Sequence, residues 1–129
     1  MNMQQQPNIQ VIINTDNPDL LVKEAKNLAG KLKMRDEATR TQVRRLFATI
    51  RQIEFKWKQD PDGAYRDLVL FGPRLAYQAH RHNEIAALTE AIRQCIPLVG
   101  KDRQKLKRLV QFFEATVAYF LAGPRYGGA

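Results

Sequence analysis

The sequence predicts an all-α fold: a compact bundle of five or six helices joined by short loops, with a flexible N-terminal arm. Apolar residues recur at the helical spacing of three and four through most of the chain. Asn-Pro, Asp-Pro and Gly-Pro pairs stand between the apolar stretches, where helices begin and end. No alternation of apolar and polar residues, the pattern of a half-buried strand, rivals these signals.

Residues 1–16 are expected to form the flexible arm. They open with a polar, glutamine-rich stretch. The apolar run at 9–13 could be a strand, but it has no partner strand to pair with. A single helical domain is therefore expected over residues 17–129.

The first two helices of this domain have clear starts. Asn17 suits the N-cap position and Pro18 the first helical position, which predicts a helix over 17–33. Thr39, with a glutamine three residues later, has the spacing of a capping box and predicts a helix over 39–58.

The later helices are separated by turns that contain Pro or Gly. A turn at residues 60–63 ends the second helix, and Asp62 is expected to cap the next one. Pro73 interrupts that helix, and it either starts a fresh helix or kinks a continuous one. Two further helices are expected over 83–100 and 101–123.

Positive charge dominates the body of the chain. The 129 residues hold 21 Lys and Arg against 13 Asp and Glu, a net charge of +8. Residues 1–38 hold five basic and five acidic side chains, residues 39–82 nine and four, and residues 83–129 seven and four. The excess therefore lies in the helical body, which predicts a face for a polyanion such as a phosphate backbone.

The same composition argues against several classes of protein. The 44% of apolar residues is too high for a disordered polybasic tail, and no stretch is long and apolar enough for a membrane span. The N-terminus lacks a signal-peptide pattern, so a cytoplasmic location is expected. Cys95 stands alone, and His80 and His82 point about 200° apart on a helix, so neither metal site nor cofactor nor enzyme activity is expected.

Basic residues form a line on the helix predicted at 39–58. On a helical wheel, four cations lie together beside the apolar arc: Arg40, Arg44, Arg51 and Lys58. This line suits contact with phosphates, although such charge patterns also occur on helix faces that meet only solvent.

Two other segments carry basic and aromatic residues. Arg74 and Arg81 share a helix face, and Tyr77 is close enough in sequence to touch Arg81. The last helix has a second stripe, which suits nucleic acid or a protein interface: Lys101, Lys105, Arg108, Phe112 and Tyr119. For its two aromatic residues, burial or an interface is the favoured interpretation over base stacking.

Three segments carry a family pattern: residues 41–47 (TQVRRLF), 75–81 (LAYQAHR) and 113–119 (FEATVAY). In this order they resemble the Thr/Ser-x-Gln-Ile-Arg opening, the Leu-Ala-Tyr-x-Ala-x-Arg segment and the Phe-Glu-Ala-x-Val-Ala-Tyr closing segment of one family. That family is the small subunit of type III-A CRISPR–Cas effector complexes, the Csm complexes. Phe120 departs from the pattern, since a polar residue is more usual there, and residues 1–16 lie outside it.

The resemblance implies a helical, non-catalytic subunit whose copies stack along the effector and line the channel for crRNA and target RNA. Its partners would be both RNAs, other Csm subunits and copies of itself, with no membrane. Arg44 and Arg81 match the motif arginines, and Arg45 is a further basic residue that the family allows. Helical geometry adds Arg40, Arg51, Lys58 and Arg74 as candidates for backbone contact that is independent of RNA sequence.

Two other functions are compatible with the sequence. A stand-alone helical DNA- or RNA-binding regulator would need a recognition helix, and none stands out. A helical protein adaptor would instead present its basic faces to an acidic partner protein.

Overall fold

The regular structure is entirely helical over residues 8–123, the part of the chain that the computed structural model describes. Its elements are α1 (Ile9–Asn14), α2 (Pro18–Gly30), α3 (Glu37–Trp57), α4 (Pro61–Arg81), a 3-10 turn η2 (Asn83–Ile85), α5 (Ala86–Val99) and α6 (Arg103–Ala122). The predicted all-α class and helix number are confirmed within this range.

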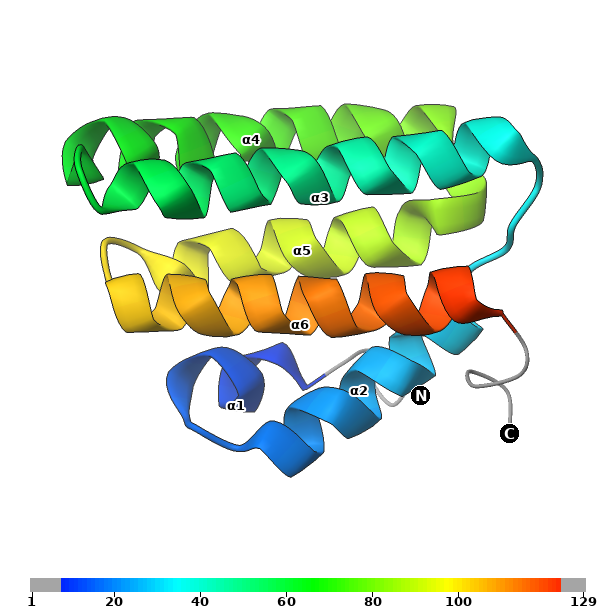
Figure 1. Cartoon of the computed structure of the whole chain (residues 1–129), viewed down its shortest axis with the longest axis horizontal. Helices are drawn as coiled ribbons and strands as arrows, with labels where there is room; N and C mark the ends of the chain where they lie inside the picture. Colours follow the sequence, from blue (N-terminus) through cyan, green and yellow to red (C-terminus); the bar gives the residue numbers. More distant parts are fainter. Residues whose placement is uncertain (1–7, 124–129) are drawn as a thin grey trace.

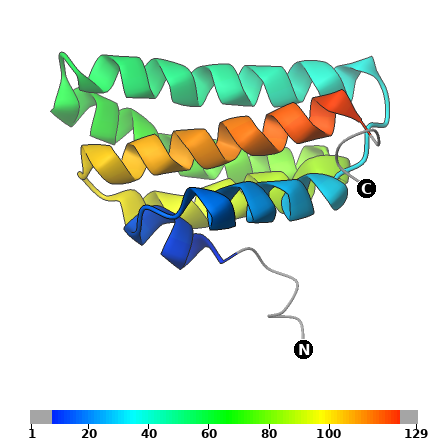
Figure 2. The same cartoon turned by 60° about the horizontal axis from the view of Figure 1, so that its bottom comes forward.

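Helices α3 to α6 form a four-helix bundle (Figure 1). Helix α3 packs against α4 and α6, and α5 packs against the same two helices from the diagonal position. Helices α1 and α2 cover α5 and α6 from one side of this bundle (Figures 1 and 2). The outer sides of α3 and α4 are therefore left without a covering helix.

Helices α2 and α4 begin at Asx-Pro pairs. The side chain of Asn17 accepts a hydrogen bond from the backbone N–H of Leu20, and Pro18 is the first helical residue, as predicted. Helix α4 differs from the prediction, because Asp60 and not Asp62 is the cap that accepts from the backbone N–H of Gly63. The cap comes earlier because Pro61 suits the first helical position and Asp62 then falls in the first turn.

Helix α3 begins two residues before the predicted start. Asp36 is the cap, and its Oδ1 accepts a 3.0 Å hydrogen bond from the backbone N–H of Thr39. The capping-box interpretation of Thr39 was wrong, because its side chain is buried and hydrogen-bonds elsewhere, to Glu84.

Helix α4 runs without interruption through Pro73. A proline in a helix leaves the carbonyl four residues earlier without its N–H partner, and here that residue is Val69. Val69 and Pro73 are both exposed, so water can hydrate the carbonyl of Val69. Of the two alternatives for Pro73, the structure shows one continuous helix.

Helix α1 corrects the expectation of a flexible arm over residues 1–16. Residues 9–14 form a short helix whose Ile12 and Ile13 are buried against α5 and α6. Arg108 Nη1 also donates a 3.0 Å hydrogen bond to the carbonyl of Ile13. A five-residue apolar run fits a strand or a helix equally well, so only tertiary packing decides its form. Residues 1–7 of the expected arm lie outside the described range.

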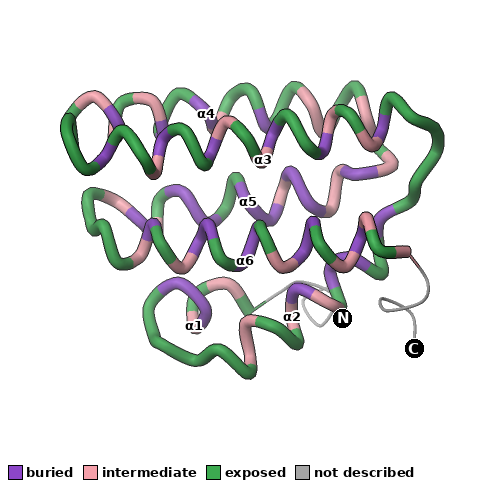
Figure 3. The backbone as a smooth tube through the Cα atoms, in the orientation of Figure 1, coloured by how far each residue is buried: buried purple, intermediate pink, exposed green. Residues whose placement is uncertain are grey.

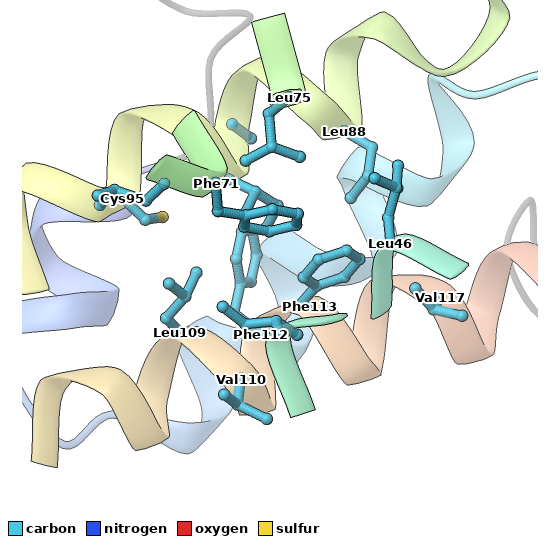
Figure 4. Close-up of a cluster of buried hydrophobic side chains, with 14 of the residues drawn as sticks. Leu46, Phe71, Leu75, Leu88, Cys95, Leu109, Val110, Phe112, Phe113 and Val117 are labelled. Atoms are coloured by element: carbon cyan, nitrogen blue, oxygen red, sulfur yellow. The ribbon is translucent and has the colours of Figure 1, made fainter. Parts of the chain in front are cut away.

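The core lies between the four bundle helices. Buried residues follow the inner side of each helix, while exposed residues follow the outer sides of α3 and α4 (Figure 3). Phe71, Phe112 and Phe113 meet near the centre of the cluster in Figure 4 and are at most 1% exposed. Cys95 is buried in the same cluster, and burial raises the pKa of its thiol to about 12. Such a thiol is inert as a nucleophile.

Candidate nucleic-acid interface on helices α3 and α4

The predicted line of cations on α3 lies along the edge of the helix that faces α6. Phe47 belongs to the same edge, and its ring contacts the ring of Phe113 on α6 at a centroid distance of 5.4 Å. Of the four cations, Arg44, Arg51 and Lys58 are exposed. Arg40 is partly buried. The line is thus at the surface, beside the core, as the periodicity predicts.

Two of these cations have acidic neighbours one helical turn away. Arg40 Nε lies 3.5 Å from Glu37 Oε1, and Arg51 Nη1 lies 3.6 Å from Glu54 Oε1. Pairs at the protein surface contribute at most about 1 kcal/mol each, and each of these pairs has one exposed and one partly exposed member. A phosphate could therefore replace the carboxylate at modest cost.

The other two cations of the line have no such neighbour. Among the described residues, no carboxylate lies within ion-pair distance of Arg44 or Lys58. Each therefore presents an uncompensated positive charge to solvent, which favours an anionic partner.

Helix α4 places Arg74 on the side that faces α3, and Arg81 follows seven residues later in the same helical register. Arg74 lines a groove between the two helices, and its guanidinium lies 5.6 Å from the ring centroid of Phe71. The Arg81 guanidinium lies 5.8 Å from the ring centroid of Tyr77, which confirms the predicted contact.

The predicted cations therefore occupy two surfaces and not one. Arg45 is one turn before Thr49, which lines the α3–α4 groove, so Arg45 lies toward α4, away from the Arg44 edge. Thr49 and Arg74 line the same groove, and the helices are antiparallel, so Arg81 lies near the level of Gln42. We call the first surface the α3 edge (Arg40, Arg44, Arg51 and Lys58). The second is the α3–α4 groove, which Arg74 lines and whose line Arg45 and Arg81 continue in the helical register.

A further cation in the groove was not predicted. Lys56 Nζ makes a 2.9 Å ion pair with Asp67 Oδ2 on α4, and both side chains line the groove. The sequence places these residues 11 apart across a turn, so only the pairing of α3 with α4 brings them together.

Phe55 is the functional candidate that the sequence reasoning missed. It is 65% exposed and lies on the outer face of α3, between Arg51 and Lys58 in the helical register. Its position on the wheel, about 120° from Val43 and outside the apolar arc, is a signal that could have found it.

The second basic stripe predicted on α6 is exposed only at Lys101, whereas Lys105 and Arg108 are partly buried. Phe112 is fully buried and Tyr119 is partly buried, so burial is the correct interpretation of both rings. Arg108 is bound to the carbonyl of Ile13. Helix α6 is covered by α1 and α2 on this side, and the sequence pattern alone could not show that covering.

One buried carboxylate lies at the end of the bundle where α3 begins and α4 ends. Glu84 has a side chain only 5% exposed, and its Oε2 accepts a 2.8 Å hydrogen bond from Thr39 Oγ1. Burial alone would raise the pKa of Glu84, but its own backbone N–H, Thr39, Arg35 and His82 together hold it below its usual value. Glu84 connects α3 to the turn after α4 through its hydrogen bond with Thr39. Among the described residues, no second carboxylate is paired with it for acid–base catalysis.

Comparison with protein families decides the identity. The chain matches the family described as Csm2 Type III-A over residues 15–123. It belongs to the Csm2 Type III-A family. Comparisons with curated proteins and with solved structures each gave no match.

Membership of the Csm2 family makes the chain a small subunit of the type III-A Csm effector complex. The match begins at Thr15, so it covers α2 to α6 and leaves α1 outside. All seven predicted basic residues lie within the matched span.

The described part of the Csm2-family chain carries neither a metal-binding cluster nor a membrane-spanning helix. Residues 8–123 contain no group of three or more His, Cys, Asp and Glu side chains placed to hold a metal ion. No helix in this range is long and apolar enough to cross a membrane.

Proposed function

We propose that this chain is a non-catalytic structural subunit that holds crRNA and target RNA in a type III-A effector through contacts to the RNA backbone. In this role it bridges neighbouring subunits, including copies of itself, during antiviral defence. Family membership supports the assembly, and the basic surfaces of α3 and α4 support the RNA contact. The cytoplasmic location expected from the sequence is part of the same proposal.

The α3 edge carries this proposal. Arg44 and Lys58 are exposed and unpaired among the described residues, and Arg51 is paired only with the partly exposed Glu54. All three stand on one long helix that α1 and α2 leave uncovered. Cations on a rigid helix suit phosphates, which look alike in every RNA sequence. A guide complex has to accept any guide, so it needs this kind of contact.

The α3–α4 groove offers a second row of backbone contacts. Arg74 and Arg81 rest against aromatic rings, which orient the guanidinium groups and limit their motion. Arg45 approaches the same groove from α3. The groove and the α3 edge lie on the two sides of one helix, so the two RNA strands could each meet one surface.

Reconstitution with the remaining effector subunits and crRNA tests the proposal. We expect the chain to co-purify with that complex and to increase its retention of target RNA equally for unrelated guide and target sequences. Failure to join the complex would reject the assembly role. Joining without any effect on RNA retention would reject the RNA contact.

The two alternative functions, a stand-alone nucleic-acid-binding regulator and a protein adaptor, predict different binding results. A stand-alone regulator would shift duplex DNA in a gel more strongly than single-stranded RNA. An adaptor would bind its protein partner equally well after nuclease treatment.

A further inference from the structure

Phe55 is exposed in a way that the fold does not explain. It is 65% exposed, the highest value among the large apolar residues of the described chain, whereas Ile53 and Trp57 on the same helix are each 5% exposed. A phenylalanine in water gives up the free energy that burial of its ring would contribute. Neither α1 nor α2 covers this face of α3.

The surroundings of the ring are cationic and polar. Arg51 lies one turn before Phe55 and Lys58 one turn after it, and Gln52 and Gln59 flank it at the same spacing. All four side chains are exposed. Phe55 is thus a single apolar ring within a polar rim, and no larger apolar patch continues from it along the helix.

Each acidic group near the ring has a partner. Glu54 pairs with Arg51 at 3.6 Å, and Asp67 pairs with Lys56 at 2.9 Å. Asp60 accepts the hydrogen bond that caps α4. Lys58 has no acidic partner among the described residues, and a partly exposed pair such as Arg51–Glu54 is weak, so both cations are available to a phosphate.

We propose that Phe55 stacks against an unpaired base of single-stranded RNA while Arg51 and Lys58 contact the flanking phosphates. The inference rests on the proposed function and adds a base contact to it. An isolated ring between two cations is complementary to one nucleotide, because the ring can stack on the base and the cations can bind the phosphates on either side. A protein interface would instead present a continuous apolar patch. Every base has a flat face, so the contact tolerates any sequence.

Binding of the full chain to two oligonucleotides of equal length tests this stacking. One probe is a mixed-sequence single-stranded RNA, and the other has the same ribose-phosphate backbone with the central bases removed. By fluorescence anisotropy, we expect the natural chain to bind the complete RNA on the order of tenfold more tightly than the abasic strand. The Phe55→Ala variant should lose this preference and retain its binding to the abasic strand.

Matched variants separate stacking from other effects of the ring. Phe55→Trp keeps a flat ring and should keep the preference, whereas Phe55→Leu keeps apolar bulk and should lose it. Val69→Ala removes a different exposed apolar side chain and should change nothing. Circular dichroism of each variant checks that the helices persist.

The outcomes also separate this inference from the proposed function. Equal preference for the complete RNA in the natural chain, Phe55→Ala and Phe55→Leu would overturn the stacking while leaving the backbone contact intact. A preference lost in Phe55→Ala but kept in Phe55→Leu would indicate an apolar contact of another kind and would also overturn it. Absence of binding to either strand by the natural chain would reject the RNA contact itself.

Discussion

The hydroxyl of Thr39 donates a 2.8 Å hydrogen bond to Oε2 of Glu84, a residue 45 positions later in the chain. Thr39 is in the first turn of α3, and Glu84 is in the 3-10 turn between α4 and α5. The carbonyl of Glu84 also accepts a 3.0 Å hydrogen bond from the backbone N–H of Lys33. Arg35 and His82 each place a nitrogen 3.6 Å from its carboxylate. One side chain thus joins the linker before α3 to the turn after α4.

Replacing Glu84 with Gln should lower stability at neutral pH and make the fold less sensitive to acid. The folded-state pKa of Glu84 lies below the ordinary value of 4.5. Its ionised form therefore stabilises the fold above that pH, and the contribution disappears as the pH falls through the lowered pKa. We expect a loss of roughly 1.5–3 kcal/mol at pH 7, the range for a hydrogen bond to a charged group.

Urea unfolding at pH 7 and pH 3 measures this effect. The difference between Glu84→Gln and the natural chain should shrink toward zero at the lower pH. Glu114→Gln, which changes an exposed carboxylate, serves as the control and should leave stability nearly unchanged at both values. A difference that stays constant with pH would show that the charge of Glu84 contributes nothing.

Replacing Arg44 or Arg81 with Ala should weaken RNA binding by a similar factor for every RNA sequence. Loss of one phosphate contact should also lower the slope of log affinity against log salt concentration by about 0.7–0.9. Gel shifts with three unrelated RNAs at several salt concentrations measure both quantities. Lys23→Ala removes the same charge from α2, on the far side of the bundle, and should have a smaller effect. A loss that depends on RNA sequence would contradict a backbone contact.

Replacing Arg108 with Ala should loosen α1 without unfolding the bundle. Arg108 Nη1 is hydrogen-bonded to the carbonyl of Ile13 at 3.0 Å, near the end of that helix. We expect a loss of about 1–2 kcal/mol, together with faster amide exchange over residues 9–14 than in the natural chain. Lys107→Ala alters the exposed neighbour and is the control, with no change expected in either measurement. Unchanged exchange in Arg108→Ala would mean that burial of Ile12 and Ile13 alone holds α1.

Cys95 should resist alkylation as long as the bundle is folded. Burial raises the pKa of its thiol to about 12, so very little of the reactive thiolate exists at pH 8. We expect iodoacetamide to modify the native chain roughly 100-fold or more slowly than the chain in denaturant. Mass spectrometry over a time course measures both rates. Rapid modification of the native chain would show that α5 opens readily around this residue.

The local structure of the longer helices could be predicted from the sequence, because their signals are local. Asn17 with Pro18 marked the start of α2, and the apolar periodicity of α3 identified its buried face. Helix α1 could not be predicted in this way, since its few apolar residues become helical only through packing on α5 and α6.

The arrangement of the basic residues was only partly predictable. A helical wheel places Arg44 and Arg45 about 100° apart, but it does not say which neighbour lies on which side. That α6 flanks the side of Arg44 and α4 the side of Arg45 follows from the packing of four helices. The same packing buries Phe112 and hydrogen-bonds Arg108 to the carbonyl of Ile13. The continuous stripe expected on the surface of α6 is therefore not present.

The long, continuous α3 has a consequence for the kinetics of RNA capture. The backbone that carries Arg44, Arg51 and Lys58 is already helical before any ligand arrives. Binding then costs the rotamer freedom of a few side chains, whereas a disordered basic tail would also have to order its backbone. For the proposed contact, association therefore proceeds without a folding step. Its rate is governed by the attraction between charges and by ionic strength.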